Sequence, residues 1–107
     1  MISKERRNLM IRHIFIAPIK EGISEEKVNE KITKMKEIKN QVPDNIQLTV
    51  GKNTGWLGIA NAVSMVIDVK DKADFDAFLS HPYHVHIGET ADDVFDISGF
   101  VISQIEY

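Results

Sequence analysis

The sequence predicts a single α+β domain in which two helices cover one face of a four-stranded antiparallel sheet. Three observations lead to this class. Four apolar runs have the composition of strands, two amphipathic runs have helical spacing, and their order along the chain is strand, helix, strand, strand, helix, strand. A chain of 107 residues is long enough for one such domain with one small core.

The first predicted strand covers residues 10–17, where β-branched and aromatic residues dominate. Pro18 ends the run. Because side chains alternate along a strand, His13 shares one face with Phe15, and Arg12 points to the opposite face.

The first predicted helix follows Ser24, a residue type that accepts a hydrogen bond from the first helical turn. The segment 40–45, which contains Pro43, ends it. Apolar residues at helical spacing predict a buried stripe: Val28, Ile32, Met35, Ile38 and Val42. Charged residues predict the solvent face: Lys27, Glu30, Lys31 and Lys34.

Two strands are predicted next, over residues 46–50 and 63–69. The second is apolar at every other position from Val63 to Val69, so this face belongs to the core. The glycine-containing loop 51–58 between them carries Trp56, the only tryptophan of the chain. We expect Trp56 to pack on the domain or to form the rim of a pocket.

The second predicted helix begins at residues 71–74, where Asp71 and Asp74 suit an N-terminal cap. Its buried stripe is expected to contain Phe75, Phe78 and Leu79, and Pro82 interrupts it. The acidic segment 89–96 is expected to form a loop or short helical turns. The last predicted strand covers residues 99–107.

This order of elements is the split βαβ, or ferredoxin-like βαββαβ, arrangement. With both helices on one face, the other face of the sheet is left uncovered. The first, third and fourth strands nevertheless carry apolar side chains on both faces. A second copy of the sheet is the simplest cover, so we predict a homodimer that packs sheet against sheet.

Composition narrows the function classes. The net charge of −3 argues against a nucleic-acid partner, and the absence of cysteine excludes disulfides and thiolate chemistry. No apolar run is long enough to span a bilayer, and no signal peptide is recognisable. We therefore expect a cytoplasmic protein without a membrane partner or a cofactor. Residues 1–9 are expected to be a flexible extension, and residues 10–107 the domain.

Histidines are the main candidates for chemistry. His81, His84 and His86 lie close together after the second helix, and His13 lies on the first strand. Histidine titrates near neutral pH and also binds metals. One interpretation places His84 and His13 at a pocket between sheet and helices, and the plainer one makes both structural. The spacing matches no strong metal signature, so no metal site is predicted.

Residues 10–107 resemble the stress-responsive α/β-barrel (Dabb) family. The likeness rests on the opening strand, on the segment Asp71 to Phe78, and on the element His81-Pro82-Tyr83-His84. The resemblance implies a ferredoxin-like subunit and a dimeric barrel. Cyclase members of the family use a histidine as general base with a tyrosine as its partner. The histidine corresponds to His84, and Phe78 occupies the position of the tyrosine.

Together these observations predict a small homodimeric barrel that binds a hydrophobic small molecule. It is a candidate cyclase or isomerase with His84 as the catalytic base. The predicted ligand-binding residues are His13, Trp56, Phe78, His81 and Tyr83. The alternative is a non-catalytic, stress-associated structural protein. A weaker alternative is oxidation of haem or another substrate, as in related dimeric barrels.

Overall fold

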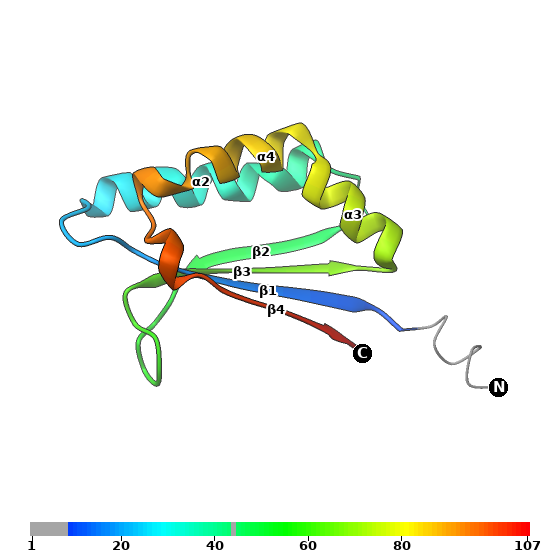
Figure 1. Cartoon of the computed structure of the whole chain (residues 1–107), viewed down its shortest axis with the longest axis horizontal. Helices are drawn as coiled ribbons and strands as arrows, with labels where there is room; N and C mark the ends of the chain where they lie inside the picture. The colour runs from blue at the N-terminus through cyan, green and yellow to red at the C-terminus, as the bar shows by residue number, and fades with distance from the viewer. Residues whose placement is uncertain (1–8, 44) are drawn as a thin grey trace.

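The structure is a computed structural model that describes residues 9–43 and 45–107 (Figure 1). It has two layers, a four-stranded sheet and a layer of helices that covers one face of it. Most of the expected extension, residues 1–8, lies outside the described residues. Among the described helices, none is long and apolar enough to cross a membrane.

The sheet contains β1 (Ile11–Pro18), β2 (Gln47–Lys52), β3 (Ala62–Val69) and β4 (Val101–Glu106) in the order β2-β3-β1-β4. All three neighbouring pairs are antiparallel. The ferredoxin-like fold predicted from the order of elements is therefore confirmed. The C-terminal strand β4 pairs with β1, so it forms one edge of the sheet and β2 forms the other.

Residues that lie opposite each other on neighbouring strands point to the same side of the sheet, so the strand register shows which residues belong to each of its two faces. His13 lies opposite Ile67 on β3 and Gln104 on β4, and this row faces the helices. Ile14 lies opposite Val66 and Ser103, and that row faces away from the helices. We call the second face, which none of the described helices covers, the open face.

Three helices form the second layer. α2 (Glu25–Gln41) begins at Ser24, whose side chain accepts a hydrogen bond from the Lys27 N–H as predicted. α3 (Lys72–Ser80) begins at Asp71, whose carboxylate accepts from the Asp74 N–H, again as predicted. α4 (Pro82–Glu89) follows directly. Two short 3-10 turns, Ala91–Asp93 and Ile97–Gly99, then lead into β4.

The interruption expected at Pro82 is present, but a third helix follows it that is not among the elements predicted above. Pro82 occupies the first turn of α4, where its missing N–H has no helical partner to lose. His81 caps this helix, because its Nδ1 accepts a hydrogen bond from the Tyr83 N–H. His84 and His86 are therefore helical, whereas His81 precedes the helix with an extended backbone.

The core lies between the sheet and the helices, and it contains the predicted stripe of α2 and the predicted apolar face of β3. Two expectations about burial within the helices are wrong. Lys31 is only 5% exposed, because its ammonium donates to the Ile87 carbonyl and to the Thr90 hydroxyl at the end of α4. Leu79 is exposed rather than buried, because it lies beside an opening in the helical layer.

Candidate functional site

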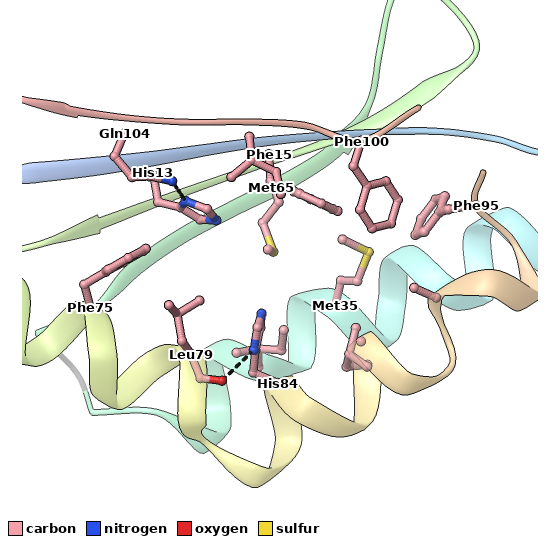
Figure 2. A pocket seen from close by; sticks show the side chains of 15 residues that line it. His13, Phe15, Met35, Met65, Phe75, Leu79, His84, Phe95, Phe100 and Gln104 are labelled. Carbon is pink, nitrogen blue, oxygen red and sulfur yellow. Dashed lines mark hydrogen bonds between the residues drawn. The ribbon is translucent and has the colours of Figure 1, made fainter. Parts of the chain in front are cut away.

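An apolar cavity of about 440 Å³ lies between the sheet and the helices (Figure 2). This volume falls within the range of small-molecule sites, about 300–1,000 Å³. Its walls come from β1, β3 and β4 on one side and from α2, α3, α4 and the segment before β4 on the other. The polar side chains among the lining residues are His13, His84 and Gln104.

His84 enters the cavity from α4. Its Nδ1 lies 3.0 Å from the Leu79 carbonyl oxygen at the end of α3. A carbonyl oxygen only accepts, so Nδ1 carries the hydrogen and donates it. In the neutral ring, Nε2 then keeps a free lone pair, and Figure 2 shows this nitrogen directed toward the sheet, into the cavity. Phe78 supports the ring from behind, with ring centroids 4.6 Å apart.

His13 enters the cavity from the opposite wall, on β1. The amide nitrogen of Gln104 lies 2.9 Å from His13 Nδ1 and donates to it. Because Nδ1 accepts, the neutral ring carries its hydrogen on Nε2. The ring also packs against Phe75, with centroids 5.2 Å apart. The cavity therefore contains one histidine fixed as a hydrogen-bond acceptor and one fixed as a donor.

Both imidazoles favour the neutral form. Burial lowers the pKa of His13, and the neighbouring His84 lowers it further. Burial also lowers the pKa of His84 and outweighs the opposing effect of the Leu79 carbonyl. An apolar environment disfavours the charged ring, so near neutral pH the Nε2 atom of His84 is free to accept a proton.

The cavity opens along the β4 edge of the sheet. Three lining residues at this opening, Leu79, Ile102 and Gln104, are exposed. Leu79 and Ile102 present apolar side chains from opposite layers. The opening therefore lies between α3 and β4, beside the Gln104 side chain.

The other four predicted ligand-binding residues do not line the cavity. Phe78 lies behind His84 and is 1% exposed. His81 caps α4, and the Tyr83 hydroxyl donates to Glu37 on α2. Trp56 lies on the loop between β2 and β3. Of the six predicted site residues, only His13 and His84 line the cavity, and Phe78 contacts the His84 ring from behind.

The helical form of α4 also decides how its histidines are arranged. Residues two apart on a helix point in different directions, so His84 faces the cavity while His86 is exposed. Within residues 9–43 and 45–107, no group of three histidine or acidic side chains is arranged to hold a metal ion.

Gln104 is the functional candidate that the sequence alone misses. Its position opposite His13 depends on the register between β1 and β4, which alternation within one strand does not determine. The apolar lining is easier to find, since Phe15 and Met65 belong to faces that alternation assigns to the core. That Leu79 lines the cavity follows only from the position of α4, which the sequence does not reveal.

A model of the family described as "Stress responsive A/B Barrel Domain" matches residues 11–102. This match covers most of the chain, including both histidines of the cavity. Among curated proteins, none matches the sequence.

Several solved structures share the fold. A dimeric ferredoxin-like protein of unknown function from Thermobifida fusca is 19% identical, with a TM-score of 0.79 over 94% of this chain and 92% of that chain. A dimeric ferredoxin-like protein from Bacteroides fragilis is 16% identical, with a TM-score of 0.75 over 92% and 96%. A hydroxynitrile lyase from Passiflora edulis is 16% identical, with a TM-score of 0.71 over 92% and 93%.

Proposed function

The chain belongs to the stress-responsive A/B barrel domain family, and from that premise we propose that it binds an uncharged apolar small molecule and catalyses a proton transfer on that molecule. The observation that carries the proposal is the Nδ1 hydrogen bond from His84 to the Leu79 carbonyl, which leaves Nε2 free in an apolar cavity. His84 is the proposed general base.

His13 is the proposed hydrogen-bond donor. With Nδ1 occupied by the Gln104 amide, its Nε2–H is available to an oxygen of the ligand. A donor facing a developing oxyanion lowers the barrier for proton removal from an adjacent carbon or hydroxyl group. The pair therefore suits a ligand with a carbonyl or hydroxyl oxygen and a removable proton.

The ligand is proposed to be neutral. The cavity lining is almost wholly apolar, and neither histidine favours its charged form, so a carboxylate inside would be a poorly compensated buried charge. Aromatic rings on the lining, including Phe15, Phe75 and Phe100, suit an aromatic or alicyclic ligand.

A thermal-shift screen tests the binding proposal. We expect acetophenone and benzaldehyde to raise the melting temperature, and the matched anion benzoate to have no effect. Leu79→Arg, which places a cation at the opening, should abolish the shift, and Val85→Arg on the outer side of α4 should retain it. Equal shifts with benzoate and acetophenone would refute a neutral ligand.

The lyase among the structural neighbours suggests one reaction to test first. In cyanohydrin cleavage, His84 Nε2 would take the hydroxyl proton, the bond to the nitrile carbon would break as the carbonyl forms, and the cyanide would receive the proton. His13 would donate to the oxygen throughout. Release of benzaldehyde from mandelonitrile by the wild type but not by His84→Gln would support this reaction. No release would favour the alternative, a non-catalytic binding or structural protein.

We also propose that the protein is a homodimer formed through the open face. This face carries Ile14, Ile16 and Val66 beside polar residues, and the described helices all lie on the other side. The two bacterial neighbours named above are described as dimeric. Sedimentation should give twice the chain mass of 12.1 kDa, and Ile14→Glu should give a folded monomer. A wild-type monomer at all concentrations would refute the dimer.

A further inference from the structure

The loop between β2 and β3, residues 53–61, has a defined conformation. The Asn53 side-chain amide donates to the Ile59 carbonyl across the loop, and the Asn53 N–H donates to the Ala62 carbonyl. Gly55 and Gly58 have φ angles of +74° and +83°, which other residues rarely adopt. A side chain at Gly55 would also approach Ala60 to 3.0 Å. These features together favour one backbone conformation of the loop.

This shape holds two large apolar side chains in water. Trp56 is 89% exposed and Leu57 is 96% exposed, so neither packs on its own domain. The expectation that Trp56 packs on the domain or borders a pocket is not met, because the glycines on both sides turn the tip outward. An ordered loop that presents such a pair is typical of a contact surface.

The loop projects to the side of the sheet opposite the helices (Figure 1). Leu57 and Ile59 line one shallow concave surface together with sheet residues such as Ser64 and Val66. Ser64 and Val66 belong to the open face, since their neighbour Met65 points into the core. The loop and the open face therefore form one continuous surface.

We propose that the loop of residues 53–61, which we call the arm, packs against a second copy of this chain, with Trp56 and Leu57 as its contact residues. This inference rests on the homodimer proposed above and specifies how it is held. In a two-fold dimer each subunit supplies both an arm and an open face, so the arm of each subunit can pack against the open face of the other. Residues 53–61 carry no charged side chain, which fits an apolar protein surface better than an anionic one.

The test uses Trp56 as its own probe, because the chain has no other tryptophan. Sedimentation and Trp56 emission are measured on the full chain over one dilution series. We expect a blue-shifted emission in the dimer that moves to the red as the dimer dissociates, with the two transitions superimposed. A dimer whose Trp56 emits as a fully exposed tryptophan would overturn the arm and leave the dimer intact. A monomer throughout would overturn the dimer as well.

A matched pair of variants locates the contact. Leu57→Asp keeps the probe and should weaken dimerisation at least about tenfold, as expected for a buried contact residue. Val85→Asp changes an exposed apolar residue on α4 and should leave the dissociation constant unchanged. Equal effects of both variants would overturn the proposal. A blue shift that depends on phosphatidylcholine–phosphatidylglycerol vesicles and not on protein concentration would instead assign the arm to a membrane.

Discussion

His13 and His84 face one cavity from opposite layers of the domain, and each ring is oriented by a hydrogen bond at its Nδ1 atom. His84 donates from Nδ1 to the Leu79 carbonyl, whereas His13 accepts at Nδ1 from the Gln104 amide. The two rings therefore present opposite hydrogen-bonding character to the same space (Figure 2). This asymmetry supports the proposed roles of His84 as the base and His13 as the hydrogen-bond donor.

Replacing His84 should remove proton transfer while preserving the fold. For a substrate found in the screen, His84→Gln is expected to lower kcat by about 10²–10⁴-fold, the usual contribution of a general base. His86→Gln, an exposed neighbour on the same helix, serves as the control and should retain full activity. Steady-state kinetics measure both, and equal activity of His84→Gln and the wild type would remove His84 from the mechanism.

The two cavity histidines should make stability depend on pH. In the unfolded chain both rings gain a proton near pH 6.5, about the ordinary value, whereas in the folded protein their lowered pKa values delay protonation. Between the lowered pKa values of the folded protein and the ordinary value of the unfolded chain, the unfolded state binds more protons. The stabilisation from the two neutral rings is therefore fully present above this pH range and decreases as the pH falls through it. Urea unfolding across this range measures the effect, and the double variant His13→Gln/His84→Gln should flatten the profile. A double variant with the same profile as the wild type would contradict the lowered pKa values of the two rings.

An ionic network on the open face should contribute in a more acidic range. Arg12 Nε and the Tyr107 hydroxyl donate to Asp68, at 2.8 and 2.7 Å. Partial burial alone would raise the pKa of Asp68, but these hydrogen bonds hold it below its usual value. The stabilisation is therefore present above the ordinary carboxyl pKa and is lost as the pH falls through the lowered one.

The variant Asp68→Asn should reduce the acid dependence of unfolding at the lowest pH values. Asp76→Asn is the control, because Asp76 pairs with Lys72 at an exposed site. Denaturant unfolding of the three proteins in acid compares them directly. A steeper loss of stability in Asp68→Asn than in the wild type would contradict the lowered pKa.

The buried Lys31 should contribute more to the free energy of unfolding than the exposed Lys34 on the same helix. Its ammonium satisfies the Ile87 carbonyl and the Thr90 hydroxyl, which terminate α4. Lys31→Ala leaves these groups without that donor and is expected to cost about 1–3 kcal/mol in the free energy of unfolding. Lys34→Ala, on the exposed side of α2, should cost less than about 0.5 kcal/mol. Similar losses in the two variants would show that the Lys31 contacts contribute little.

Local signals in the sequence predict the framework of the domain well. Ser24 and Asp71 cap helices where their side-chain chemistry indicates, and alternation places His13 on the same face as Phe15, with which it lines the cavity. The resemblance at His81-Pro82-Tyr83-His84 leads to His84, which does line the cavity. These predictions succeed because each depends on residues close together in the chain.

Predictions that depend on tertiary arrangement are the ones that fail. The ammonium of Lys31 reaches partners on α4 that no pattern within α2 reveals. The position of Gln104 beside His13 follows from strand register, and the exposure of Leu79 follows from the path of α4. Trp56 extends into solvent because the loop turns at glycines whose φ angles only the structure defines.

The tautomer of His84 is the most direct test of the central claim. Long-range ¹H–¹⁵N NMR correlations of the imidazole near neutral pH, assigned by comparison with His84→Gln, distinguish the possible forms. The account predicts a hydrogen on Nδ1 and an unprotonated Nε2, with the Nε2 resonance shifting when a neutral ligand such as acetophenone binds. A hydrogen on Nε2, or a doubly protonated ring, would contradict the assignment of His84 as the base.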